Sequence, residues 1–313
     1  MTGSRRPHPA LLAVAVSLMS ATGVSAQGVA AAATPPAASA VTAPSTTAPA
    51  TAADTIFGRS GRLLARFFAP PRSMEVEPIA RLFGKREQKD DATVAVTDST
   101  SGRNLSLITL RPFAEKTKDG RVGDYHIGRF PQERGRLRSS AYVNPEGFIE
   151  VTLENKDTPV SEHFRLADFL THDQKNVWPK YLVLREELVD KLELVLVELQ
   201  RRGVDAQRLR IMSGFRSPQY NRRTRGTAQD SRHQFGDAAD ILVDNNGDGR
   251  LDDLNRDGRV NSKDIRIMAD AVDSVERQYP ELIGGLGIYR ATRVRQPFIH
   301  VDTRGVRARW GRY

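Results

Sequence analysis

The chain has 313 residues, which allows one large domain or two modest ones, and its formal net charge is +9. It contains no cysteine, so disulfide bonds are excluded and its core must hold without them. The same absence leaves histidine, aspartate and glutamate as the side chains that can bind a transition-metal ion.

The first residues have the composition of a secretory signal peptide. Arg5 and Arg6 precede an apolar run at residues 11–19, and a small-x-small cleavage site follows at residues 24–26. The run is too short for a transmembrane helix, although an uncleaved anchor is the alternative. We predict a signal peptide over residues 1–26 and a secreted or periplasmic protein of the cell envelope. No later segment is apolar enough to span a bilayer, so we expect no integral membrane segment after cleavage.

Two segments without a clear core follow. Residues 27–54 are almost entirely Ala, Pro, Thr, Ser and Val, which predicts a disordered linker. Residues 55–91 are basic, and we expect them to be partly helical because four apolar side chains could share one helical face. These are Leu63, Leu64, Phe67 and Phe68.

Residues 92–160 are predicted to form a β-rich N-terminal region. Short apolar or alternating runs lie between Gly, Asn and Asp turns, which is typical of strands. The runs cover residues 93–96, 105–110, 125–127 and 148–153. Nothing in this region indicates chemistry.

Residues 161–313 contain the residues that suggest chemistry. A helix is predicted over residues 181–202 with Gly203 as its cap, and a strand over residues 209–212. Gly236 permits a tight turn before a buried strand at residues 238–243.

Strand periodicity then groups the polar side chains. A period of two puts Asp240 on one face of its strand and puts His300 and Asp302 together on one face of another. If the two strands share a sheet, His233, Asp240 and His300 can converge on one ion. Two imidazoles and a carboxylate are a usual ligand set for a catalytic zinc that keeps its fourth position for water. The alternative for each histidine is a satisfied core residue.

These residues belong to a longer pattern. Ser231 begins S-x-H-x-x-G-x-A-x-D, and His300 begins H-x-D. Residues 213–221 read S-G-F-R-S-P-Q-Y-N, and the sequences G-L-G-I-Y and R-W stand at residues 285–289 and 309–310. The whole resembles the zinc D-Ala-D-Ala carboxypeptidase and murein endopeptidase family, and is most similar to its MepK-type H-x-D branch.

The resemblance implies an α+β fold: a catalytic domain of hedgehog/D-Ala-D-Ala-peptidase type, with an antiparallel sheet flanked by helices. It implies an exported zinc metallopeptidase that acts on peptidoglycan peptides, and the H-x-D branch favours an endopeptidase. The alternatives are a D-Ala-D-Ala carboxypeptidase and a non-catalytic, calcium-stabilised wall-binding module. A basic chain could also bind nucleic acid, but export argues against that partner, whereas wall carboxylates suit the charge.

The resemblance also implies roles for other residues. Arg216 would face the substrate, as a catalytic or substrate-binding group, and Ser217, Tyr220 and Asn221 would be substrate-binding residues that shape the pocket. Ser231 would support Asp240 as a hydrogen-bond donor.

The general base is less clearly marked. Many relatives place a glutamate three residues before the last ligand, where this chain has a proline, so Asp302 is the candidate general base. Its competing role is to orient a metal ligand.

Residues 244–264 carry a second metal signal. Oxygen-bearing side chains recur at positions one, three, five, nine and twelve of two overlapping loops, each with glycine at position six. With the backbone position seven, the predicted calcium residues are Asp244, Asn246, Asp248, Arg250, Asp252, Asp253, Asn255, Asp257, Arg259, Asn261 and Asp264. Both loops lack the bidentate glutamate at position twelve, which predicts weak binding suited to calcium-rich surroundings. A solvated acidic turn is the alternative.

Overall fold

The structure is a computed structural model that describes residues 65–69, 84–88, 93–98, 104–136, 139–293 and 295–311. The predicted signal peptide and the predicted linker at residues 27–54 lie outside the described residues. None of the described helices is both long enough and apolar enough to span a bilayer.

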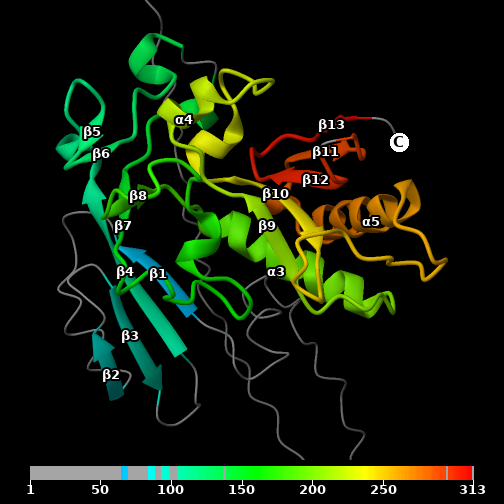
Figure 1. Ribbon diagram of the computed structural model, residues 1–313. Helices are drawn as coiled ribbons and strands as arrows, with labels where there is room; N and C mark the ends of the chain where they lie inside the picture. Colours follow the sequence, from blue (N-terminus) through cyan, green and yellow to red (C-terminus); the bar gives the residue numbers. More distant parts are fainter. Residues whose placement is uncertain are drawn as a thin grey trace, which may run out of the picture. The chain divides into compact units, whose positions relative to one another are not determined.

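The first sheet is built from the N-terminal strands (Figure 1). Its order is β2-β3-β4-β7-β8, and β1 pairs with β4 in parallel. The strands are β1 (Ala65–Ala69), β2 (Gly84–Gln88), β3 (Thr93–Asp98), β4 (Asn104–Pro112), β7 (Gly147–Val151) and β8 (Lys180–Leu182). A separate two-stranded ribbon joins β5 (Arg121–Val122) to β6 (Tyr125–His126). The four runs predicted as strands in residues 92–160 form β3, β4, β6 and β7.

The prediction of a helical face is wrong for Phe67 and Phe68, the two of its four residues that the structure describes. Both belong to β1, where Phe67 pairs with Leu107 and Phe68 with Ile108 of β4. Phenylalanine favours strands. Pairing with β4 also satisfies the backbone hydrogen-bonding groups of β1, whereas a short isolated helix would be only marginally stable. Leu63 and Leu64 lie outside the described residues.

The second sheet positions the chemistry. Its order is β13-β11-β12-β10-β9, and all pairs are antiparallel except β11 with β13. The strands are β9 (Leu209–Ser213), β10 (Ala238–Val243), β11 (Gly285–Tyr289), β12 (Phe298–Asp302) and β13 (Ala308–Trp310). The expectation that β10 and β12 share a sheet is confirmed, because Asp240 pairs directly with His300.

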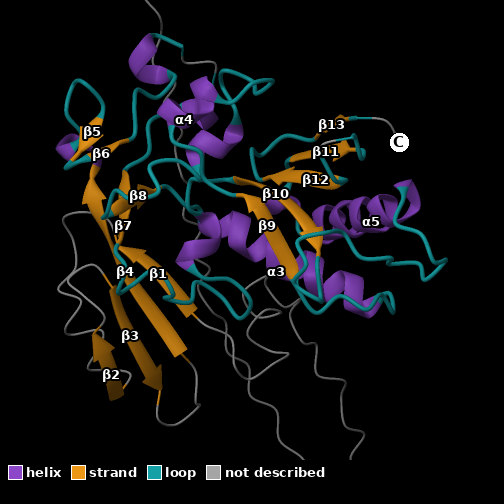
Figure 2. Ribbon diagram, in the orientation of Figure 1, coloured by secondary structure: helices purple, strands orange, loops and turns teal. Residues whose placement is uncertain are grey.

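Two long helices pack beside this sheet (Figure 2). They are α3 (Glu186–Arg201) and α5 (Ser262–Gln278); the short α4 (Pro218–Arg223) leads toward the site. One-turn 3-10 helices cover Phe113–Glu115, Gln132–Arg134, Ser140–Tyr142, Leu166–Phe169, Arg232–Phe235 and Pro280–Leu282. The mixed α+β class is therefore confirmed.

The predicted helix at residues 181–202 begins later than expected. Tyr181 and Leu182 belong to β8, where they pair with β7, and the helix starts at Glu186. Two glutamates in the first turn complement the positive end of the helix dipole. At the other end Gly203 adopts a left-handed φ of 77°, as predicted for a cap.

The face of β12 opposite the site belongs to the core. Ile299 and Val301 are fully buried in the hydrophobic cluster that also contains the apolar faces of α3 and α5. Since side chains alternate along a strand, His300 and Asp302 project to the other face.

A buried ionic group ties the two helices to β12. The Lys191 ammonium of α3 donates to Glu276 Oε1 of α5 at 2.6 Å, to the Leu282 carbonyl at 3.0 Å and to the Asp302 carbonyl at 2.7 Å. Glu276 also pairs with Arg309 of β13. Lys191 is fully buried, so its charge depends on these partners.

Removing Glu276 from this group should lower the stability of the fold more than removing Lys191. Glu276→Ala leaves the Lys191 ammonium buried with only carbonyl partners, and we expect it to lower the free energy of unfolding by about 3–5 kcal/mol. Lys191→Met leaves Glu276 paired with Arg309, so its cost should be smaller. Urea denaturation of the two variants and the wild type measures the difference. Equal costs would contradict the prediction, because they would mean that the buried ammonium does not depend on Glu276.

Candidate metal centre

The segment that carries His233 is a single 3-10 turn, Arg232–Phe235, ended by Gly236. Gly236 has a left-handed φ of 70°, and a Cβ there would lie 2.3 Å from the Val183 carbonyl oxygen. Only glycine fits both conditions. The turn therefore needs Gly236 to bring His233 next to the first strand residues of β10.

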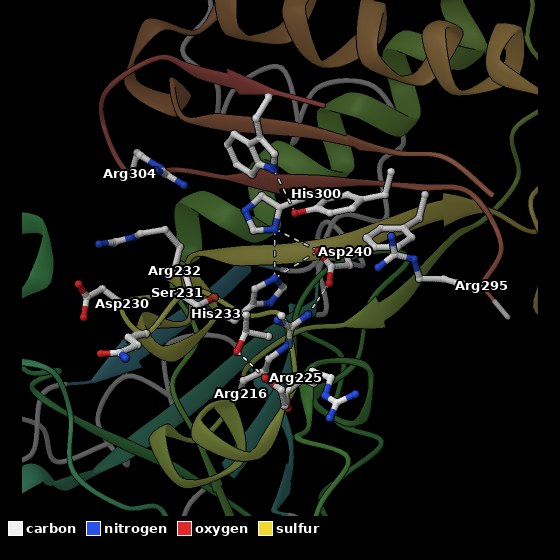
Figure 3. Close-up of a pocket in the computed structure, with 18 of the residues that line it drawn as sticks. Arg216, Arg225, Asp230, Ser231, Arg232, His233, Asp240, Arg295, His300 and Arg304 are labelled. Carbon is white, nitrogen blue, oxygen red and sulfur yellow. Dashed lines mark hydrogen bonds and ion pairs between the residues drawn. The ribbon is translucent and has the colours of Figure 1, made fainter. Parts of the chain in front are cut away.

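Three side chains converge beyond this turn (Figure 3). His233 Nε2 lies 3.1 Å from His300 Nδ1 and 3.2 Å from Asp240 Oδ1, and His300 Nδ1 lies 3.0 Å from the same oxygen. All three residues are buried. The predicted grouping of His233, Asp240 and His300 is thus present in the structure.

The outer hydrogen bonds show which ring nitrogens carry protons in the neutral imidazoles. His233 Nδ1 lies 2.7 Å from the Gly214 carbonyl, and His300 Nε2 lies 3.1 Å from Asp302 Oδ2. Both partners only accept, so these nitrogens are the donors. The lone pairs of His233 Nε2 and His300 Nδ1 then face each other and the Asp240 carboxylate.

Three acceptors this close repel unless a proton or a metal cation lies between them. Ligand atoms arranged tetrahedrally at 2.0–2.1 Å around zinc are about 3.3–3.4 Å apart, close to the three distances observed. The donor set and its spacing therefore fit a metal ion. Two imidazoles and one carboxylate also leave one tetrahedral position for another ligand.

The electrostatics of the group favour a bound positive charge. Burial holds the pKa of His233 below its usual value, although Asp240 opposes this. For His300 burial also lowers the pKa, but hydrogen bonds to Asp240 and Asp302 outweigh it and the net pKa is raised. The pKa of Asp240 is lowered despite its burial, because both histidines interact with the carboxylate. The two aspartates thus attract a cation to His300 and its neighbours.

The open side of the group is a cavity of about 490 Å³. Its lining includes all three convergent side chains, the loop of residues 224–232, and aromatic residues of β11, β12 and β13. The cavity leaves the position between the three convergent side chains open to a ligand from outside.

Asp302 does not occupy the place expected of a general base. It is fully buried and does not line the cavity; it lies behind the His300 ring as seen from Asp240. Its carboxylate accepts hydrogen bonds from His300, from the Gly285 N–H at 2.7 Å and from Arg304. This geometry favours the competing role, in which Asp302 orients His300.

Arg216 lines the cavity, but its guanidinium is engaged. It pairs with Asp240 Oδ2 and donates to Ser213 Oγ at 2.8 Å. The charge expected to meet a substrate instead holds Asp240 in place. The donor to Asp240 is thus Arg216, and not Ser231 as the sequence suggested.

Ser217, Tyr220 and Asn221 do not line the cavity. Ser217 caps α4 by accepting from the Tyr220 N–H at 3.1 Å. Asn221 donates to the Ala228 carbonyl at 2.9 Å and so fixes the loop that forms one cavity wall. None of the three residues is therefore in the cavity lining, and Ser217 and Asn221 instead support segments next to it.

Sequence reasoning missed the aromatic wall. The centre of the Trp310 ring lies 5.1 Å from the centre of the His300 ring, and the Trp310 Nε1–H donates to Tyr289 Oη at 3.0 Å. A Cβ at Gly287 would lie 2.4 Å from the Trp310 indole, so this glycine makes room for the ring. The signal was present in the G-L-G-I-Y and R-W motifs, which matched the family without indicating what their residues contact.

The predicted calcium residues form hydrogen-bonded turns. Asp244 Oδ2 accepts from the Gly249 N–H at 3.0 Å and Asp253 Oδ2 from the Gly258 N–H at 2.6 Å. Asp264 accepts from three backbone N–H groups, including that of Asn261 at 2.7 Å, and caps α5. Within the described ranges, no three acidic side chains of this loop bring ligand atoms close enough together for one ion. Calcium binding stays a prediction.

The comparisons with known proteins agree with the site. The model of the family described as Peptidoglycan L,D-endopeptidase MepK matches residues 149–310, just over half of the 313-residue chain. No curated protein and no solved structure matches the chain, so the likeness to hedgehog-type domains stays a prediction. The matched range begins on β7, before residue 161, where the region predicted to carry the chemistry starts. It includes all three convergent residues, His233, Asp240 and His300. The chain belongs to the family of the peptidoglycan L,D-endopeptidase MepK.

Proposed function

We propose that the protein is an exported zinc peptidase that hydrolyses peptide cross-links between peptidoglycan stem peptides. The observation that carries the proposal is the set of three lone-pair atoms, from His233, Asp240 and His300, that face one another beside a cavity. Membership of a peptidoglycan endopeptidase family supports the substrate class. The N-terminal signal-like sequence supports export.

A zinc ion at such a site supplies Lewis-acid polarisation of a carbonyl group and activates water. His233, Asp240 and His300 would hold it. The Gly214 carbonyl orients His233, and Asp302 orients His300. Such hydrogen bonds fix the tautomer and the ring direction of a ligating histidine.

The cavity wall offers a further donor for the reaction. Tyr289 Oη accepts the Trp310 N–H and has no acceptor for its own proton among the described residues, so this proton can point toward a substrate oxygen. A donor of this kind stabilises the negative charge that develops on a scissile carbonyl.

An endopeptidase is favoured over a D-Ala-D-Ala carboxypeptidase because the matching family is described by endopeptidase activity. A non-catalytic wall-binding module is less consistent with a ligand triangle that opens onto a cavity. Each alternative gives a different product.

Purified cross-linked muropeptides test the proposal. The wild-type chain should release two shorter peptides with a new amine within the peptide, and chelation of zinc should stop the reaction. His233→Ala should abolish metal binding and reduce turnover by more than about 10³-fold, because the metal provides the main electrostatic stabilisation of the transition state. His172→Ala, which changes an exposed histidine outside the cavity, is the matched control. Release of D-Ala alone would favour the carboxypeptidase, and no product would favour the binding module.

Asp302→Asn separates the two roles considered for Asp302. If the carboxylate orients His300, the substitution should weaken zinc affinity by about 10–100-fold, as is typical of such partners. Zinc titration against a competing chelator measures this, with the exposed Asp270→Asn as control. Unchanged zinc affinity with lost turnover would instead restore Asp302 as the general base.

A further inference from the structure

Five arginines line the cavity beside the convergent group, and they are not equivalent. They are Arg216, Arg225, Arg232, Arg295 and Arg304. Three are neutralised by aspartates: Arg216 by Asp240, Arg232 by Asp237 and Arg304 by Asp302. The guanidinium groups of Arg225 and Arg295 have no hydrogen bond or ion pair with any residue in the part of the chain that the structure describes. Asp230 is a further carboxylate on the lining, so four carboxylates stand against five guanidinium groups and the cavity keeps a net positive charge.

Arg295 differs from Arg225 because its guanidinium lies beside two aromatic rings, which form a platform for it. Its guanidinium carbon lies 5.2 Å from the centre of the Tyr289 ring and 5.1 Å from that of Phe298. The two rings stack on each other at 4.6 Å with an angle of 8° between their planes. Cation–π contact holds the guanidinium without using its N–H groups, so its donors stay available.

The platform connects Arg295 to the metal centre through short contacts. Tyr289 and Phe298 are paired residues of β11 and β12, and Phe298 stands two positions before His300 on the same face. Tyr289 Oη accepts the Trp310 N–H, and the Trp310 ring contacts His300. Figure 3 shows the guanidinium end of Arg295 directed toward the cavity, on the side of Asp240.

We propose that Arg295 binds a free carboxylate of the peptide substrate and thereby fixes the position of the scissile bond over the metal centre. This inference rests on the proposed function, whose substrates carry free carboxylates beside their peptide bonds. A guanidinium donates two parallel hydrogen bonds to a carboxylate, which gives direction as well as charge. A neutral amide at the same place could not form the ion pair. Arg295 thus takes the role that the sequence suggested for Arg216.

The test compares two substrates and two variants. The substrates are a cross-linked muropeptide with free carboxylates and the same compound with these carboxylates amidated. The variants are Arg295→Gln and Arg293→Gln. Arg293 is an exposed arginine of the same loop that does not line this cavity, so its substitution matches the charge change.

The wild type should prefer the free carboxylate. Arg295→Gln should lower kcat/KM on that substrate by about 10–100-fold, as expected for loss of a charge-assisted hydrogen-bonded pair. The same substitution should leave kcat/KM on the amidated substrate unchanged. Arg293→Gln should keep the wild-type preference. An equal fall on both substrates, or a preference that survives in Arg295→Gln, would overturn the proposal.

A binding measurement separates this inference from the proposed function. Calorimetry with the chelator-treated full chain and the same muropeptides should show tighter binding of the free carboxylate, and Arg295→Gln should remove the difference. If the zinc-loaded wild type shows this binding pattern but cleaves nothing, the proposed peptidase activity is rejected and the carboxylate site is retained. Cleavage without any effect of Arg295→Gln on binding or discrimination would reject the carboxylate site alone.

Discussion

The site depends on one electrostatic constraint: when both imidazoles are neutral, three hydrogen-bond acceptors face one another. His233 Nε2, His300 Nδ1 and Asp240 Oδ1 are separated by 3.0–3.2 Å. In the neutral imidazoles, the ring proton is donated away from this group, by His233 to the Gly214 carbonyl and by His300 to Asp302. Such an arrangement is stable in a buried setting when a cation joins the three atoms.

Most of the surrounding structure serves to keep these atoms in place. Pairing of β10 with β12 puts Asp240 opposite His300, and the Gly236 turn brings His233 to them. Arg216 holds the second oxygen of Asp240, while Arg304 and the Gly285 N–H hold Asp302. Strands β10 and β12 fix the backbones of Asp240 and His300, and the 3-10 turn fixes that of His233, so the three side chains are aligned before any ligand binds.

The ligand group could be predicted from the sequence because it follows from strand periodicity. Asp240 and His300 lie on strands whose alternation is visible in the residues themselves, and only the assumption of a shared sheet was needed. The roles of Asp302 and Arg216 could not be predicted, because they depend on which side of a ring or carboxylate each group occupies. Phe67 shows a similar limit, since a short apolar run fits a helix face or a strand until its partner is known. The carboxylate role proposed for Arg295 rests on its contact with two rings from different strands, which no local pattern reveals.

X-ray absorption at the zinc edge tests the central claim most directly, because it reports the atoms bound to the metal. Metal analysis of the zinc-loaded full chain should give one zinc per chain, and its absorption spectrum should show two imidazole nitrogens and carboxylate or water oxygens at about 2.0–2.2 Å. A chain that takes up no zinc, or a spectrum without imidazole scattering, would contradict the account.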